Sequence, residues 1–276
     1  MSGKPRSFNV YNVGQACCTS VTLENKGIFF ADIGLTKDRV ELDMEEIKNA
    51  KKKINGIIPQ AVILSHWDLD HILGITNACD SIYDATWIVP DLWGLQIVKK
   101  NGTIDEKQIS DSAKRLLKYL DWKIKDKLII VGDDLIKKCI YENPTKTVSI
   151  WTGERVTKTG KNANKKQFQI TRANNFGLII YIKNDSAALF PGDCEYSVIP
   201  DTLLDKEINY LLVPHHCSKM SSPRIKASCG VKRAILSYGI HNKHGHPDGL
   251  HMKQIYDMGY QIISTVGKEE IKLDLK

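Results

Sequence analysis

One short segment of the sequence gathers four side chains that commonly bind metal ions. Residues 66–71, HWDLDH, contain His66, Asp68, Asp70 and His71. Imidazole and carboxylate groups are the usual protein ligands of zinc, manganese and iron. A tight loop can direct alternate side chains at one point, and this one directly follows an apolar stretch that is typical of a buried strand. The segment therefore predicts a metal-binding loop at the end of a strand.

Other apolar stretches also run into residues that can bind or support a metal ion. The polar residues at or beyond their ends are Asp32, Asp193, the adjacent pair His215 and His216, and His246. A lone residue of this kind would more often be structural. Because several such stretches agree with one ligand-rich loop, we expect their ends to converge at one edge of the sheets.

Short strands and amphipathic helices are predicted to position these residues. Segments rich in Val, Ile, Phe and Thr predict strands over 7–13, 19–23, 27–33, 61–65, 177–183, 187–191, 209–213, 233–238 and 260–264. An Asn-Lys-Gly turn predicts that 19–33 forms a hairpin. Apolar residues at helical spacing predict helices over 43–54 and 105–125. Two runs of strands with helices between them, and no linker, indicate one α/β or α+β domain over residues 1–276 with two packed sheets.

Composition excludes several classes of protein. The 276 residues are 42% hydrophobic and 26% charged, which excludes a disordered chain. No apolar run approaches the roughly 20 residues that span a bilayer, so we expect no membrane partner. The N-terminal residues lack the apolar core of a secretory signal. The seven cysteines form no CxxC pair, which indicates free thiols in a reduced, cytoplasmic protein.

The charge of the chain is compatible with an anionic partner without requiring one. The formal net charge is +7, and the stretch 155–170 holds Arg155 and four lysines but no acid. We predict an exposed loop or ragged hairpin there, within a variable basic insert at about 95–170. The stretch could guide a nucleic-acid backbone, with Trp151 stacking on a base. A solvated loop and a tryptophan in the core are the favoured alternative.

The order of the motifs DxG, HxDxDH, GD, PHH and GHP is similar to that of hydrolases with the metallo-β-lactamase fold. In detail, the sequence resembles the hydrolase domain of ComEC-type competence proteins over about residues 8–265. The matching segments are 9–15, 174–179, 213–218 and 242–247. The resemblance implies a four-layer αββα sandwich with a metal site at one edge of the two sheets. The membrane channel of the competence proteins is absent, which implies a stand-alone hydrolase domain.

Four departures from this pattern concern the surroundings of the site. Asp68 stands where the fold commonly has a histidine, as in the competence branch. The histidine that the fold carries between the HxHxDH and Asp motifs is missing, and Asn174 or Asn175 could substitute for it. The run 14–17, GQAC, stands where the family has GQG followed by an acid. Cys217 replaces the glycine of the family's HHGS motif.

The predicted ligands are sufficient for two divalent cations, Zn²⁺ or Mn²⁺, about 3.5–4 Å apart. The predicted metal ligands are His66, Asp68, Asp70, His71, Asp193, His215 and His246. By analogy with the fold, His66 and Asp68 would hold one ion, Asp70, His71 and His246 would hold the other, and Asp193 would bridge them. The sequence leaves open which of the paired histidines is the ligand; His216, with Asp70, is assigned to catalysis.

Three further residues receive supporting roles. Asp32 is expected to orient a ligating histidine from behind, although a carboxylate that only forms the turn is the alternative. Ser218 and Lys219 could contact the non-reacting oxygens of a phosphate. An exposed polar turn at these two positions is about as compatible with the sequence.

These features predict a metal-dependent hydrolase, most specifically a phosphodiesterase or nuclease that acts on DNA through a metal-bridging hydroxide. The alternative is a hydrolase of a small phosphoester or another ester, similar to phosphorylcholine esterases. It would use the same metal ligands but have a narrower opening to the active site. A non-catalytic component of a multi-protein system, for example in defence, is the third hypothesis. A non-catalytic component would be expected to lack some of the metal ligands, whereas all of the expected ligand residues are present here. The insert could dock a protein partner, which nothing in the sequence identifies.

Overall fold

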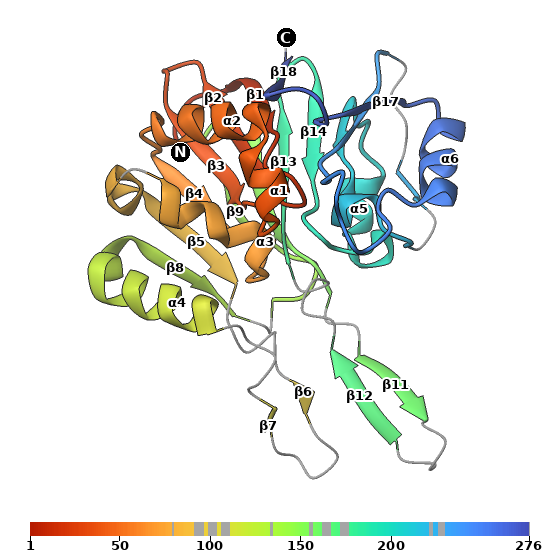
Figure 1. Ribbon diagram of the computed structural model, residues 1–276, viewed down its shortest axis with the longest axis horizontal. Coiled ribbons are helices and arrows are strands. Elements are labelled where there is room, and N and C mark those ends of the chain that lie inside the picture. Colours follow the sequence, from red (N-terminus) through yellow and green to blue (C-terminus); the bar gives the residue numbers. More distant parts are fainter. Residues whose placement is uncertain are drawn as a thin grey trace.

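Two mixed β-sheets of seven strands each pack face to face, and helices cover their outer faces (Figure 1). The computed structural model describes residues 1–78, 80–90, 97–98, 104–105, 111–132, 135–154, 157–161, 167–171, 177–220, 223–225 and 230–275. Within these ranges no helix is both long and apolar enough to cross a membrane. The arrangement is the four-layer αββα sandwich that the sequence resemblance implied.

The first sheet has the strand order β18-β1-β2-β3-β4-β5-β8. Its strands are β1 (Pro5–Tyr11), β2 (Cys18–Leu23), β3 (Ile28–Ile33), β4 (Ala61–Ile63), β5 (Thr86–Pro90), β8 (Leu128–Val131) and β18 (Glu270–Asp274). The strands from β18 to β3 pair antiparallel, and those from β3 to β8 pair parallel. The predicted hairpin over 19–33 is confirmed as β2 and β3.

The second sheet has the strand order β17-β16-β15-β14-β13-β10-β9. Its strands are β9 (Cys139–Glu142), β10 (Val148–Thr152), β13 (Leu178–Lys183), β14 (Ala187–Phe190), β15 (Tyr210–Leu212), β16 (Arg233–Leu236) and β17 (Gln261–Ser264). The strands from β14 to β17 pair parallel. Each sheet thus has a parallel half whose strands end at the same edge.

Helices lie on the outer face of each sheet. Against the first sheet lie α1 (Arg39–Asp43), α2 (Glu45–Asn55), α3 (Leu69–Ile72) and α4 (Asp111–Ile124), and against the second lie α5 (Asp201–Leu204) and α6 (Gly249–Asp257). Short 3-10 helices are η1 (Leu73–Asn77), η2 (Asp80–Asp84), η5 (Lys125–Lys127), η7 (Tyr196–Val198) and η8 (Pro214–Cys217). The predicted helix over 43–54 is confirmed as α2, which begins at Glu45 because the extended Met44 separates it from α1.

Three apolar layers hold the sandwich together, and strand alternation distributes residues between them. Phe29 and Ala31 of β3 face the layer between the two sheets, whereas Phe30 faces the layer under α2 and α4. Successive side chains of a strand point to opposite faces, so a strand buried on both sides is apolar throughout. The third layer lies between the second sheet and its helices and includes Leu203 and Ile255.

The stretch assigned to a variable basic insert, about 95–170, contains strands of both main sheets. β8 belongs to the first sheet and β10 to the second. Two small separate sheets are also present, β6 (Ile97–Val98) with β7 (Ile104–Asp105), and β11 (Thr157–Lys161) with β12 (Gln167–Thr171). The β11–β12 pair is the predicted ragged hairpin, and it extends away from the sandwich in Figure 1. Of the predicted helix over 105–125, α4 covers Asp111–Ile124; Asp105 belongs to β7 instead, and residues 106–110 lie outside the described residues.

Phe8 connects the two sheets, and its truncation tests the central layer. Its fully buried ring lies 5.2 Å from Phe190 and 5.6 Å from Tyr210, measured between ring centroids. We expect Phe8→Ala to lower the free energy of unfolding by about 3–5 kcal/mol, measured by urea denaturation. Ile58→Ala, at a side chain that is 73% exposed, should change it by less than about 0.5 kcal/mol. Equal effects of the two substitutions would contradict this description of the core.

Candidate metal centre

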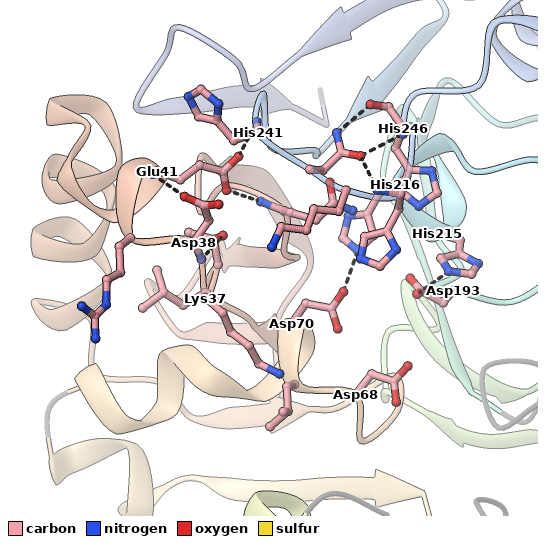
Figure 2. A pocket seen from close by; sticks show the side chains of 18 of the residues that line it. Lys37, Asp38, Glu41, Asp68, Asp70, Asp193, His215, His216, His241 and His246 are labelled. Carbon is pink, nitrogen blue, oxygen red and sulfur yellow. Dashed lines mark hydrogen bonds and ion pairs between the residues drawn. The ribbon is translucent and has the colours of Figure 1, made fainter. Parts of the chain in front are cut away.

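The parallel strands of both sheets deliver polar residues to one shared cavity. Asp32 lies at the end of β3, and the 66–71 loop follows β4. Asp193 follows β14, and His215 and His216 follow β15. The cavity has a volume of about 700 Å³, and Figure 2 shows Asp68, Asp70, Asp193, His215, His216 and His246 around it. The convergence of strand ends that the sequence predicted is therefore observed.

Asp32 fixes the orientation of His71 from behind the cavity. One oxygen of its carboxylate accepts the Ser65 N–H at 2.6 Å, and the other accepts the Ser65 hydroxyl at 2.7 Å and His71 Nδ1–H at 2.8 Å. His71 Nε2 is thereby left to face Asp193. Burial lowers the pKa of His71, but the charges of Asp193 and Asp32 outweigh it and raise that pKa well above its usual value. The same negative charge would attract a bound cation.

Asp193 occupies the middle of the cluster, with its two oxygens directed at different histidines. Its Oδ1 lies 3.2 Å from His71 Nε2. Its Oδ2 lies 3.7 Å from His66 Nε2 and 3.6 Å from His215 Nε2. The side chain is 3% exposed. Burial would raise the pKa of this carboxyl, but the neighbouring histidines hold it well below its usual value, so the group is an anion.

His66 and Asp68 lie on one side of Asp193. The His66 Nδ1–H is directed at the Ser65 hydroxyl, 3.0 Å away, and Nε2 lies 3.5 Å from Asp68 Oδ2. Asp68 directly precedes α3 in an extended conformation, which directs its half-exposed side chain into the cavity. Burial raises the pKa of Asp68, but the hydrogen bond and the charge of His66 together have the larger effect, so this pKa is lowered.

Asp70 and His216 lie on the other side. His216 Nε2 lies 3.2 Å from Asp70 Oδ2, and its Nδ1–H donates to the Ser237 carbonyl at 2.7 Å. Burial raises the pKa of Asp70, but the hydrogen bond from His216 and the charge of His71 together have the larger effect. The pKa of Asp70 is therefore lowered. His66, His71 and His216 therefore share one feature: Nδ1 is held by a protein oxygen and Nε2 is directed into the cluster. This is the support that metal-ligating histidines receive.

The structure separates the two adjacent histidines. His215, His216 and Cys217 all have left-handed backbones, with φ of 50°, 53° and 62°. This turn buries the His216 side chain, which is 1% exposed, and leaves that of His215 38% exposed at the cavity. Cys217 stands where the resembling family has glycine, which adopts such a φ at no steric cost. Both nitrogens of His216 face protein atoms, so His216 has no ring nitrogen free for a substrate.

His246 lies beside this pair, on a loop that Asn242 holds. Asn242 accepts the His246 N–H at 2.9 Å and donates to the His246 carbonyl at 2.7 Å. The ring of His246 lies 5.9 Å from that of His215 and 6.3 Å from that of His216. Burial and the charges of nearby histidines lower its pKa to about 4, so the ring is neutral at pH 7 and can act as a ligand. The structure thus brings together all the predicted metal ligands.

Buried polar atoms without partners show that the cluster suits a cation. Within the described part of the chain, six buried side-chain nitrogen or oxygen atoms lack a hydrogen-bond partner. Three of them are at this site: His66 Nε2, His71 Nε2 and Asp193 Oδ1. The close approach of His71 Nε2 to Asp193 Oδ1 is therefore not a well-directed hydrogen bond. Each unpaired buried group costs about 1–3 kcal/mol, and a bound cation would satisfy all three.

Sequence analysis missed several residues of the site. Cys17 is one of four residues, with His71, Asp193 and His216, whose possible ligand atoms all lie within 4.8 Å of one another. The buried carboxylate of Glu41 accepts the N–H groups of Gln15 and His241, both at 3.1 Å, and joins two loops of the cavity wall. Cys17 ends the run 14–17 that was noted as a departure from the resembling family, but nothing in that run marked it as a ligand, and Glu41 belongs to no recognisable motif.

Other predicted residues lie apart from the cavity. Ser218 is buried and its carbonyl accepts His251 Nδ1–H at 2.7 Å, while Lys219 is exposed, and neither lines the cavity. Trp151 is half-buried, packs against the outer layer of the second sheet and donates its Nε1–H to Ser149, so it meets the core alternative only in part. Asn174 and Asn175, the proposed substitutes for a missing histidine, lie outside the described residues, as do Arg155, Lys165 and Lys166.

Comparison with known proteins identifies the fold. No protein-family model and no curated protein matches the sequence. Among solved structures, the long form of RNase Z from yeast aligns with 99% of this chain, with a TM-score of 0.51 and 10% identity; the chain spans 42% of that protein. A diphosphatase of the PhnP family aligns over 98% of both chains, with a TM-score of 0.44 and 11% identity. At these identities the likeness concerns the fold alone.

Asp32 offers a direct test of how the site is supported. We expect Asp32→Asn to weaken metal binding about 10–100-fold, because the amide cannot hold both the Ser65 hydroxyl and His71 Nδ1–H as the carboxylate does. Competition with a chromophoric chelator measures this affinity. Asp38→Asn is the matched control, because Asp38 lines the same cavity and caps α1, a role that asparagine fills equally well. Unchanged affinity in Asp32→Asn would contradict the supporting role.

Proposed function

We propose that this chain, which has the metallo-β-lactamase fold, is a hydrolase that cleaves phosphodiester bonds with the help of two divalent cations. The observation that carries the proposal is the position of Asp193. Its buried carboxylate directs one oxygen at His71 and the other at His66 and His215. A carboxylate that faces two separate sets of ligands is suited to bridge two ions. The yeast RNase Z that shares the fold is by name a nuclease, which is compatible with this chemistry.

The side chains fall into two ligand sets that share Asp193. One set comprises His66, Asp68, His215 and Asp193 Oδ2, and the other comprises Asp70, His71, His216 and Asp193 Oδ1. We therefore propose His216 as a ligand, whereas the sequence assigned it to catalysis. His246 flanks both paired histidines and stays a predicted ligand.

Each component of the site has a chemical task. Two adjacent cations, when bound, supply a water of lowered pKa and neutralise charge on a phosphoryl oxygen. Asp193 and Asp70 keep their negative charge because their histidine neighbours lower their pKa values. The hydrogen bonds of Ser65, Asp32 and Ser237 hold the histidine rings in fixed orientations, so that little reorganisation is needed at the moment of reaction.

DNA is the substrate that we propose, as in the resemblance to the competence proteins. The cationic side chains of Lys37, Arg39 and Lys243 line the cavity beside the acidic cluster. They could contact phosphates on either side of the scissile bond. One observation favours the alternative of a small phosphoester: a cavity of about 700 Å³ also matches the size of small-molecule sites.

Activity on polymers distinguishes these substrates. We expect the wild type, supplied with Mn²⁺ or Zn²⁺, to cleave DNA, and we expect cleavage to fall as salt increases because phosphate contacts release counterions. The His66→Ala/Asp193→Ala variant should be inactive, and Lys253→Ala, an exposed residue on α6, should match the wild type. Single- and double-stranded DNA, RNA and a chromogenic phosphodiester are assayed in parallel. Bound metal with cleavage of the small ester alone would replace DNA by a small substrate.

The role of His216 has a separate test. We expect His216→Ala to lose about one of two bound ions per chain and to lower stability, because Asp70 and the Ser237 carbonyl lose their partner. Elemental analysis of the purified protein measures the metal content. His241→Ala is the control, since His241 is an exposed histidine on the same cavity. Full metal content with lost activity in His216→Ala would restore the catalytic role that the sequence assigned.

A further inference from the structure

We propose that Cys17 binds one of the two cations through its sulfur, as a thiolate ligand beside His71, His216 and Asp193. This inference rests on the proposed metal-dependent function and specifies the chemistry of one of its two ion positions. Cys17 is 6% exposed and lies in the loop between β1 and β2, directly before β2. It belongs to none of the motifs that identified the other ligands.

The backbone of Cys17 is fixed against the two segments that carry the site. Its N–H donates to the Asp70 carbonyl at 3.0 Å, and its carbonyl accepts the Gly34 N–H at 2.6 Å. Gly34 makes this approach possible, because a Cβ at that position would collide with the Asp70 carbonyl. The side chain of Cys17 is therefore held beside the 66–71 loop before any ion binds, as a preorganised ligand requires.

The sulfur lies within the ligand set that contains Asp70. Cys17 Sγ is 3.8 Å from His216 Nδ1, the ring nitrogen that donates to the Ser237 carbonyl. One possible ligand atom each of Cys17, His71, Asp193 and His216 lies within 4.8 Å of the other three. Two buried atoms of that group, His71 Nε2 and Asp193 Oδ1, have no hydrogen-bond partner. These unpaired atoms indicate independently that an ion belongs at this place.

The adjacent thiol shows what a purely structural cysteine looks like in this chain. Cys18, the first residue of β2, is fully buried in the apolar layer with Phe30 and Ile33. Burial raises the pKa of its thiol well above the usual value, so this thiol stays protonated. Neighbouring residues of an extended chain point to opposite faces. Cys18 therefore faces the core, whereas Cys17 faces the acidic and imidazole cluster.

A sulfur ligand would make the two ion positions chemically different. The set of His66, Asp68, His215 and Asp193 offers only nitrogen and oxygen, which suit Mn²⁺ as well as Zn²⁺. The set with Cys17 adds a soft thiolate, which favours Zn²⁺. Binding would form a sulfur–metal bond and release the thiol proton to solvent. The choice between Zn²⁺ and Mn²⁺, open from the sequence, would then be decided at one position.

Reconstitution with Co²⁺ tests the proposal without any measurement of activity. We expect the wild type with two equivalents of Co²⁺ to show a sulfur-to-cobalt charge-transfer band in the near ultraviolet. The band should be absent from Cys17→Ser and retained in Cys18→Ala, the matched control. We also expect Cys17→Ser to bind one of its ions more than about 100-fold more weakly, beyond the loss typical of a supporting residue.

A second measurement keeps the test decisive if Cys17→Ser folds poorly. X-ray absorption of the zinc-loaded wild type should show a sulfur neighbour at about 2.3 Å. Zinc or cobalt that binds with nitrogen and oxygen neighbours only would overturn the role of Cys17 and leave the proposed function standing. A wild type that binds neither metal would overturn both. A charge-transfer band that persists in Cys17→Ser would also reject Cys17 as the source of the sulfur.

Discussion

The buried negative charge of Asp193 is the constraint around which the site is organised. A carboxylate that is 3% exposed would be costly without compensation, and three histidines face its two oxygens. Two of those histidines, His71 and His66, are in turn held by Asp32 and by the Ser65 hydroxyl. The polar network thus extends from the end of β14 to the ends of β3 and β4, and it joins the two sheets at the edge where their parallel strands finish.

Backbone strain accompanies the convergence of the candidate ligands at this edge. Asp32, His215, His216 and Cys217 all have left-handed φ values, although none is glycine. A left-handed conformation costs about 1–2 kcal/mol for such a residue. The apolar layers on both faces of the sheets offset this cost, and residues held in strained conformations are concentrated at functional sites. The strained residues at this edge therefore support, together with the arrangement of the side chains, the view that the cavity is a functional site.

The elements that were predicted correctly are those whose own residues form a clear sequence pattern. The hairpin of β2 and β3 has a turn between two apolar segments, and α2 has apolar residues at helical spacing, so both were predicted close to their observed positions. β5 and β8 were missed, because they have no polar and apolar alternation and, unlike the equally short parallel strands β4 and β15, neither runs into a ligand-rich segment. β10 was missed as a strand because its surroundings were assigned to an insert.

Residue types and their positions in the sequence predicted the candidate ligands and the strand ends from which they come. The 66–71 loop, Asp193, His215, His216 and His246 were all predicted from residue type and position. Only the tertiary structure separated His215 from His216 and brought Cys17 to the cluster. The reason is that Cys17 and His216 are 199 residues apart in the chain. Their proximity depends on how two sheets pack, and no local pattern of residues encodes that distance.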